Sequence, residues 1–225
     1  MFVARRPSAN STPKRSISSG ISLDIARVRV VERRGLLPEH LQGPRDIVLR
    51  RWVPADAESL GRAVAQSHEH VRPWLPWASQ EPLSLERREA MILDWEREWL
   101  KGGDVIMGIF ISGQVVGGCG LHDRIAPGGL EIGYWTHPAV GGRGIATTAA
   151  GLLTDAAFAM PGITHVEIHV DKANERSSAI ALTLGYRLVA EEPEEVEAPG
   201  EVGLHCIWRL TVEEWRQRAR LVAQT

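Results

Sequence analysis

The chain has 225 residues, of which 44% are hydrophobic, and a formal net charge of −2, so it is long enough to bury one substantial core. Its charge is uneven, because residues 1–45 carry +6 and the remaining 180 residues carry −8. An acidic body argues against a nucleic-acid-binding protein, and Cys119 and Cys206 are too few for a disulfide scaffold or a zinc site. With no apolar run of membrane-spanning length and no signal core, we expect a cytoplasmic protein without a membrane partner.

The first segment of the chain differs in composition from the rest. Residues 1–20 combine Ser, Pro, Arg and Asn with few large apolar side chains, which predicts a disordered basic arm. Residues 21–45 are predicted to form a partly ordered extension, in which the alternating stretch ISLDIARVRVVE indicates an extra strand. The folded domain is therefore expected at residues 46–225.

The folded domain is predicted to open with a strand and two helices. IVLRRW has the composition of a strand, and Asp56 is placed to cap a helix that ends near Gln66. The prolines in SHEHVRPWLPWASQEP argue against a regular helix, which leaves Trp74 and Trp77 on a loop. Ser84 can cap the second helix.

An antiparallel meander is predicted over residues 105–136, because its apolar or alternating runs are separated only by short glycine turns. A glycine-rich loop then leads into a helix from Ile145, whose apolar residues recur every three to four positions. HVEIHV is the next strand and should pair in parallel across this helix-length crossover. Asn174 caps a short helix that ends at Gly185. Two more strands and a C-terminal helix complete an α/β (α+β) domain with a mixed, mainly antiparallel sheet.

Residues 130–158 form the stretch around which the fold is organised, with a strand, a glycine loop and a helix start in succession. Loop N–H groups and the positive end of the helix dipole converge there, which would stabilise an anionic phosphate. A Walker A loop is excluded, because no lysine lies between Lys101 and Lys172. A dinucleotide-binding fingerprint needs a third glycine where Thr147 stands and a parallel sheet before it. Only Asp171, at the end of the next strand, favours that alternative.

The same stretch resembles motif A of the Gcn5-related N-acetyltransferase (GNAT) superfamily, whose loop pattern is Gln/Arg-x-x-Gly-x-Gly/Ala. Gly144 and Ala146 match its last two defined positions, whereas Gly141 replaces the Gln or Arg. VRPWLPWA, GGCGLH, EIGYW, GRGIAT and DKANERSSA are similar, in that order, to the branch of the Rim-type (RimJ/RimL-like) ribosomal-protein N-terminal acetyltransferases. The resemblance spans residues 45–210, approximately. It implies a sheet of about seven strands flanked by helices, with a central splayed parallel pair.

The resemblance also implies a co-substrate and the residues that bind it. Acetyl-CoA, or another acyl-CoA, would supply the acyl group without a metal, and its pyrophosphate would lie on the glycine loop. The implied coenzyme-binding residues are Trp135, Thr136, His137, Gly142, Arg143, Gly144, Ile145, Ala146, Thr147, Asn174 and Ser177.

Acyl transfer from a thioester to an amine needs a neutral amine, a polarised carbonyl and a proton for the thiolate. Glu131 matches the strand glutamate that acts as general base in some family members. Beside Trp135 in a partly dry cleft its pKa is expected to rise, and a solvated strand residue is the alternative. The carbonyl oxygen would accept from a backbone N–H near Trp135 or Thr136. Many relatives protonate the thiolate with a tyrosine where this chain has Ala181, so Ser177, in an Asn-x-x-Ser pattern, is expected to orient the sulfur.

The acceptor side is harder to predict than the coenzyme side. Trp74, Trp77 and His122 are the candidates, although the two tryptophans could equally pack their loop onto the core. The strand HVEIHV carries two histidines and a glutamate on one face, but without further ligands a metal site is not expected. Cys119 lies between glycines and indicates a small buried strand residue rather than an acyl-enzyme nucleophile.

These observations favour an acyl-CoA-dependent N-acyltransferase that works by direct attack in a ternary complex. The resemblance implies an amine acceptor, such as a protein N-terminal amine. A small-molecule amine such as a polyamine or an amino sugar is the first alternative, because the acidic stretch of residues 191–201 would attract cations. A catalytically inactive acyl-CoA-binding sensor or interaction module is the second. The acyl group and a homodimeric assembly stay open at this point.

Overall fold

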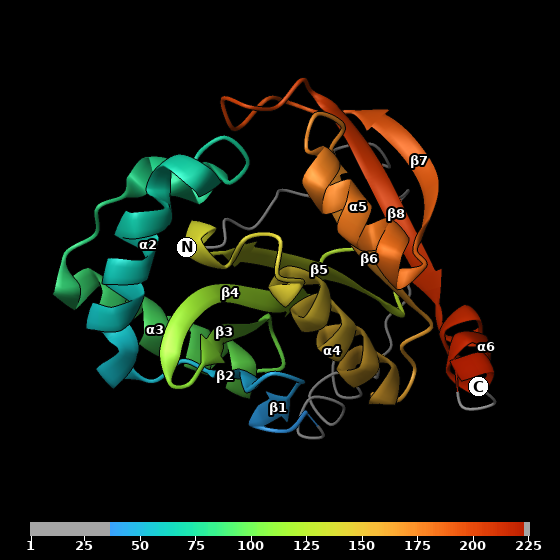
Figure 1. Ribbon diagram of the computed structural model, residues 1–225, viewed down its shortest axis with the longest axis horizontal. Helices are drawn as coiled ribbons and strands as arrows, with labels where there is room; N and C mark the ends of the chain where they lie inside the picture. The colour runs from blue at the N-terminus through green and yellow to red at the C-terminus, as the bar shows by residue number, and fades with distance from the viewer. Residues whose placement is uncertain (1–36, 223–225) are drawn as a thin grey trace, which may run out of the picture.

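The structure, a computed structural model, describes residues 37–222, with side chains up to residue 218 in the last helix. The basic arm expected at residues 1–20 and the strand expected within ISLDIARVRVVE lie outside the described residues. The described chain folds into one mixed sheet with helices on both faces (Figure 1).

The sheet has eight strands within the described residues, one more than the approximate number expected. The additional strand is β1, which is only three residues long and pairs with β2 in antiparallel register. In spatial order the strands are β1 (His40–Gln42), β2 (Ile47–Arg51), β3 (Val105–Ile111), β4 (Gln114–His122), β5 (Gly129–Thr136), β6 (His165–Asp171), β8 (Leu204–Thr211) and β7 (Arg187–Pro193). All neighbours are antiparallel except β5 and β6, which pair in parallel as the helix-length crossover predicted.

Within residues 37–222, five α-helices and three short 3-10 turns cover the sheet. They are η1 (Pro54–Asp56), α2 (Ala57–Val71), η2 (Pro76–Gln80), α3 (Leu85–Leu100), η3 (Pro138–Val140), α4 (Ile145–Ala159), α5 (Glu175–Leu184) and α6 (Val212–Val222). Figure 1 shows α4 and α5 on the near face of the sheet, with α2 and α3 at the end nearest β3 and β4. None of the helices in the described part of the chain is both long and apolar enough to cross a membrane.

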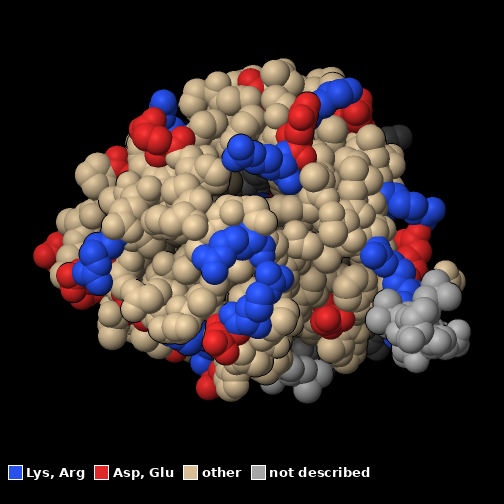
Figure 2. Space-filling view, viewed as in Figure 1, with Lys and Arg blue, Asp and Glu red and all other residues tan. Residues whose placement is uncertain are grey.

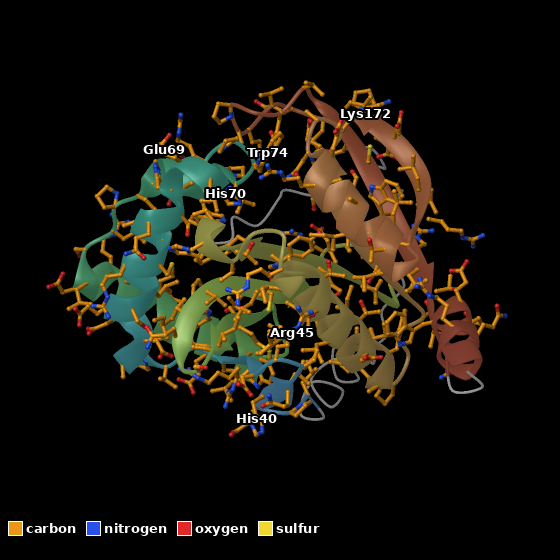
Figure 3. All side chains as sticks on the ribbon, viewed as in Figure 1. His40, Arg45, Glu69, His70, Trp74 and Lys172 are labelled. Atoms are coloured by element: carbon orange, nitrogen blue, oxygen red, sulfur yellow. The ribbon has the colours of Figure 1, made fainter. Side chains whose placement is uncertain are left out.

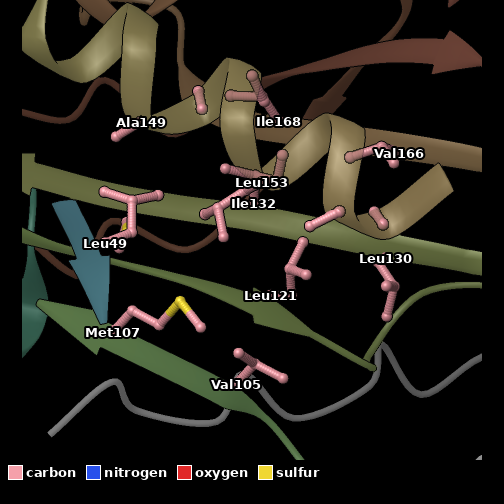
Figure 4. Close-up of a cluster of buried hydrophobic side chains, with 14 of the residues drawn as sticks. Leu49, Val105, Met107, Leu121, Leu130, Ile132, Ala149, Leu153, Val166 and Ile168 are labelled. Atoms are coloured by element: carbon pink, nitrogen blue, oxygen red, sulfur yellow. The ribbon is translucent and has the colours of Figure 1, made fainter. Parts of the chain in front are cut away.

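Two apolar cores result from the period-two alternation of the central strands. Leu130 and Ile132 of β5 pack with Ala149 and Leu153 of α4 in the larger core (Figure 4). Trp135 points to the opposite face and packs in the smaller core against α2 and η2. Each large side chain buried in this way contributes roughly 1.5–3 kcal/mol. The alternation of β5 therefore assigns neighbouring residues to opposite sides of the sheet.

Strands β5 and β6 pair with each other over only part of their length and then diverge. Only three register pairs join them, and the last is Glu131 with Glu167. Beyond that point β5 stays paired with β4 as far as Thr136, and β6 stays paired with β8 as far as Asp171. We call this divergence the split. It is the splayed parallel pair that the family resemblance implied.

The first helix and its loop differ from the sequence prediction. Helix α2 continues to Val71 instead of ending near Gln66, because Val64, Ser67 and Val71 extend its buried stripe at spacings of three and four. Trp77 lies in η2 and is buried, so only Trp74 lies on an irregular loop. Strand β7 also extends further than expected and includes the first two acidic residues of the predicted loop.

Candidate active site

The glycine loop joins β5 to α4 by way of η3. Gly142 and Gly144 have φ values of 71° and 74°, a left-handed conformation in which a side chain would be strained. Gly144 is the N-cap of α4 and makes no side-chain bond to its first N–H groups. Those donors and the positive helix end are therefore directed at one point, as an anion site requires.

Two arginines lie at this loop. Nη1 of Arg45, between β1 and β2, donates a hydrogen bond to the carbonyl oxygen of Arg143 at 3.1 Å. Figure 2 shows basic side chains gathered over the start of α4, and Figure 3 labels Arg45 there. Sequence analysis identified Arg143 but missed Arg45, because 98 positions separate them. Two guanidinium groups beside a helix N-terminus add to the attraction for phosphate.

An open groove of about 490 Å³ extends from the loop along α4 towards α5. Of the predicted residues in the first turn of α4, Thr147 lines this groove, Ala146 is half-buried beside it, and Ile145 points into the larger core. Ile145 can therefore offer only its backbone to a ligand. The groove is lined by Arg45, Gly144, Thr147, Thr148, Gly151, Leu152, Asp155, Thr183 and Leu184.

The side chains at the end of β5 were expected to contact the coenzyme, but they make contacts within the protein instead. The Trp135 indole lies over Gly118, where an added Cβ would come within 2.6 Å of its Nε1 atom, and it contacts Trp77 edge to face at 6.1 Å. Nδ1 of His137 accepts from the N–H of Ala139 and stabilises η3. The indole of Trp135 is therefore buried in the core, and Nδ1 of His137 is used within the turn at the start of the glycine loop.

The direction of the β5 amides follows from one hydrogen bond. The N–H of His137 donates to the carbonyl oxygen of Val116 on β4. Because backbone groups alternate along a strand, the amides of Tyr134 and Thr136 point the other way, towards β6, and they lie beyond the last register pair, so they point into the split. Of the two donors expected for the thioester carbonyl, Thr136 is therefore correctly directed and Trp135 is not.

Ser177 meets a partner that sequence analysis missed. The hydroxyl groups of Tyr134 on β5 and Ser177 on α5 lie 2.8 Å apart, so this hydrogen bond crosses the split. Asn174 is the N-cap of α5, and its side chain accepts from the N–H of Ser177. Burial raises the pKa of Tyr134 to about 12, which keeps its phenol protonated as a hydrogen-bond donor. The alternation of Leu130, Ile132 and Tyr134 was the available signal for its position on the α4 face.

Glu131 differs from its predicted state. Arg124 donates to both of its carboxylate oxygens, with Nε at 2.8 Å and Nη2 at 2.6 Å. Burial alone would raise the pKa of Glu131, but the hydrogen bonds and charge of Arg124 outweigh burial and hold this pKa below its ordinary value. The expectation of a raised pKa was therefore wrong. Arg124 lies in the β4–β5 connection, whose path the sequence did not indicate.

Further charged side chains continue from Glu131 across this face of the sheet. Glu167 accepts from Nε of Arg209 at 2.6 Å, and its other carboxylate oxygen lies 2.6 Å from Nε2 of His169. Burial would raise the pKa of Glu167, yet His169 and Arg209 lower it. Nδ1 of His169 is 3.9 Å from Glu131. We call the whole set the ion-pair row, with members Asp104, His122, Arg124, Glu131, Glu167, His169 and Arg209.

The three predicted acceptor-side residues lie in different surroundings. His122 is fully buried in the ion-pair row, with Nδ1 2.6 Å from Asp104. Trp77 is buried against Trp135, which agrees with the packing alternative. Trp74 lies with Glu69 and His70 at the end of α2 (Figure 3), next to the point where Gly200 donates to the carbonyl oxygen of Pro73 at 2.8 Å.

Asp171, the residue that favoured a dinucleotide site, uses its carboxylate to bind backbone N–H groups of this chain. Its carboxylate accepts from the N–H groups of Ala173, Val202 and Gly203. It thereby fastens the loop between β7 and β8 to the end of β6. Its role is the placement of an acidic loop rather than the recognition of a ribose.

The groups of β6 and the thiol of Cys119 are both engaged or buried within the described part of the chain. Among the described residues, no group of three or more His, Cys, Asp or Glu side chains could hold a metal ion. The acidic and imidazole groups of β6 are instead engaged in the ion-pair row. Cys119 is fully buried, and burial raises the pKa of its thiol far above the ordinary range, so a reactive thiolate is suppressed.

Comparison with known proteins agrees with this arrangement. A family described as "Acetyltransferase (GNAT) domain" matches residues 46–187. YdaF of Bacillus subtilis strain 168, a candidate ribosomal N-acetyltransferase by its name, is 30% identical over 142 residues, covering 62% of this chain and 77% of YdaF. RimJ of Mycobacterium smegmatis, solved with a CoA disulfide, is 25% identical with a TM-score of 0.69, covering 82% of this chain and 92% of that chain.

A second solved structure supports the fold alone. RimL, a ribosomal L7/L12 α-N-protein acetyltransferase solved with coenzyme A, is 18% identical with a TM-score of 0.71. The similarity covers 78% of this chain and 99% of RimL. With the family match over most of the described domain, the split in the sheet and the anion site at the start of α4, the chain belongs to the GNAT acetyltransferase family and is an N-acetyltransferase.

Proposed function

We propose that the protein transfers an acyl group, acetyl in the simplest case, from acyl-CoA to an amine by direct attack in a ternary complex. The observation that carries this proposal is the split, which the Tyr134–Ser177 hydrogen bond crosses and near which the anion site lies at the start of α4. A thioester placed there would have its phosphates at one end and its sulfur near the other.

The residues around the glycine loop fit the charged part of the coenzyme. The backbone N–H groups of Gly142, Gly144 and Ala146 would bind the pyrophosphate, with Arg143 and Arg45 as counter-charges. The groove between α4 and α5 has room for the nucleotide end. Thr147 lines it, whereas His137 and Asn174 hold the surrounding turns in place.

The chemistry divides between the strand and α5. The amides of Tyr134 and Thr136 point into the split and can polarise a carbonyl oxygen as its negative charge develops. If the phenol of Tyr134 donates to Ser177, the Ser177 hydroxyl is left to donate towards sulfur. Such a bond stabilises the leaving thiolate without a full proton transfer. The buried Cys119 is consistent with direct attack rather than an acyl-enzyme.

The acceptor we propose is the N-terminal amine of a protein. The description of YdaF as a candidate ribosomal N-acetyltransferase and of RimL as an α-N-protein acetyltransferase supports this choice. We place the approach of the amine on the face of the sheet that carries the ion-pair row. A small cationic amine is the second candidate. It is favoured by the exposed glutamates of the β7–β8 loop, of which Glu195 and Glu197 are examples.

Mass spectrometry of acylated products separates these candidates. Purified protein would be incubated with acetyl-CoA or succinyl-CoA and with peptides that have free or blocked N-termini, and with polyamines and amino sugars. We expect a mass increase of one acetyl group on peptides with a free N-terminus only. Modification of polyamines alone would favour the small-molecule candidate. Tight coenzyme binding without any product would favour an inactive acyl-CoA-binding module.

A further inference from the structure

We propose that His169, held by Glu167, is the group that removes the proton from the incoming amine. This inference rests on the proposed transfer to an amine and assigns the proton acceptor within that site. It moves the general-base role away from Glu131, the residue that the sequence suggested. It rests on the geometry of the ion-pair row.

The two carboxylates nearest the split are already neutralised. Arg124 forms a two-point pair with Glu131, and Arg209 donates to Glu167. Both acids are almost fully buried, with 5% and 3% of their surface exposed. Proton transfer to Glu131 would leave Arg124, whose side chain is only 21% exposed, without its anion, which is strongly unfavourable. Proton transfer to Glu167 would remove the buried charge that holds both Arg209 and His169.

One ring nitrogen of His169, Nε2, is hydrogen-bonded to Glu167, and the other, Nδ1, can act as a base. Glu167 is an ionised acceptor, so Nε2 of His169 must carry the hydrogen of their 2.6 Å hydrogen bond. The lone pair of the neutral ring is then on Nδ1. The nearest charged atom of Glu131 is 3.9 Å from Nδ1, too far for a hydrogen bond but close enough to stabilise a positive charge there.

The other charged groups around His169 support the same assignment. On β6 itself, Nε2 of His165 is 3.9 Å from Glu167. From β4, His122 pairs with Asp104 and acts on Glu131 only through its charge. The two arginines pair with the two glutamates, so a proton gained by the imidazole of His169 places a new positive charge between two carboxylates.

The position of His169 fits the path of the amine. It lies two residues beyond Glu167, the last residue of β6 that is paired with β5, and therefore at the opening of the split. It shares a sheet face with Glu131 and Trp135, opposite the face that Tyr134 and α4 occupy. Its side chain is 15% exposed, compared with 4% for Glu167, so His169 is the more accessible member of the pair.

The reaction balances with this assignment. Nδ1 of His169 takes one proton from the ammonium group, which leaves a neutral amine and an imidazolium. The amine nitrogen then bonds to the acyl carbon as the carbon–sulfur bond breaks, and the proton remaining in excess on nitrogen passes to the thiolate. The imidazolium releases its proton to water. An α-amino group ordinarily titrates about one to two pH units above histidine, whereas a lysine ε-amine titrates about four above it. We therefore expect a preference for α-amines.

The test compares H169Q with H165Q, a matched change on the same strand and face. We expect H169Q to lower kcat by about a hundredfold or more, to abolish the rise of kcat/KM with pH, and to recover activity with added imidazole. Calorimetry should give coenzyme A dissociation constants within about twofold of the wild type for both variants. H165Q should keep the wild-type pH profile. An H169Q enzyme with wild-type kcat and pH profile would overturn the assignment.

Two further measurements cover the case in which H169Q does not fold. E167Q keeps the imidazole but removes the anion that accepts its Nε2 hydrogen bond and fixes its ring, so kcat should fall by about tenfold or more with coenzyme A binding unchanged, and a wild-type kcat would contradict the assignment. By NMR, addition of coenzyme A and an acceptor peptide should shift the His169 ring signal but not that of His165, without any turnover. If the wild type acylates no amine, the proposed function itself fails, and the role of His169 fails with it.

Discussion

The pair of Arg124 and Glu131 provides the sharpest test of the charged face of the sheet. E131Q keeps the shape of the side chain but removes the anion that accepts two hydrogen bonds from Arg124. Loss of one partner from a buried pair costs about 3–5 kcal/mol. The Arg124 side chain is 21% exposed, and Asp104 also stabilises its charge. We therefore expect E131Q to lower the free energy of unfolding by an amount at the lower end of this range, about 3 kcal/mol. That value corresponds to a thermal midpoint lower by roughly 6–12 °C in a domain of this size.

Urea unfolding at pH 7 measures this loss directly. Four proteins are compared: the wild type, E131Q, R124M and the double variant. We expect the double variant to be more stable than R124M or E131Q alone, because it leaves no unpaired buried charge. A free energy of unfolding for E131Q within about 0.5 kcal/mol of the wild type would refute the reasoning, since surface changes commonly fall in that range.

The difference in the free energy of unfolding between wild type and E131Q should become smaller as the pH falls. The pKa of Glu131 is lower in the folded protein than its ordinary value of 4.5, so the carboxylate contributes its full stability above that value. The contribution is lost as the pH falls through the lowered pKa. Wild type and E131Q should therefore differ by a constant amount between pH 6 and 8 and converge in acid. Divergence on acidification would contradict the pairing.

Two further predictions concern the coenzyme side of the split. Y134F and S177A should each lower kcat by about tenfold in steady-state assays. The double variant should lose little more activity, because the two hydroxyls act as one unit. Additive losses in the double variant would argue against that unit. G144A should weaken coenzyme binding by about tenfold and destabilise the fold by about 1–2 kcal/mol, measured by calorimetry and urea unfolding. G113A is the control, because Gly113 has a φ of 77° in an open turn and should show the strain without the binding loss.

The fold could be predicted where the determining signals are local. Alternation identified the strands of the meander, and Ser84 and Asn174 were recognised as helix caps that the structure confirms. The helix-length crossover indicated the parallel pairing of β5 with β6. Each of these signals involves residues within one element or its immediate neighbours, so the sequence carries them without knowledge of the tertiary structure.

The candidate site could be predicted only in part, because its electrostatics depend on contacts between elements. Glu131 lies on the strand where it was predicted, but its protonation depends on Arg124, which the loop before β5 brings back onto that strand. Arg45 reaches the glycine loop from the β1–β2 connection. The side chain of Tyr134 has a predictable direction, but its hydroxyl partner is 43 residues away. A raised pKa was expected for Glu131 because burial was considered without a partner.

The alternation of β5 also bears on how two substrates could react without displacing one another. Glu131 and Tyr134 are three residues apart, so their side chains lie on opposite faces of the sheet. In the mechanism we propose, the ion-pair row and the incoming amine belong to one face, and the hydroxyl pair and the coenzyme to the other. The split connects the two faces of the sheet, because β5 and β6 no longer share hydrogen bonds there. An amine and a thioester that meet through this opening need no covalent intermediate on the protein, and the base that serves the amine is kept apart from the hydroxyls that serve the sulfur.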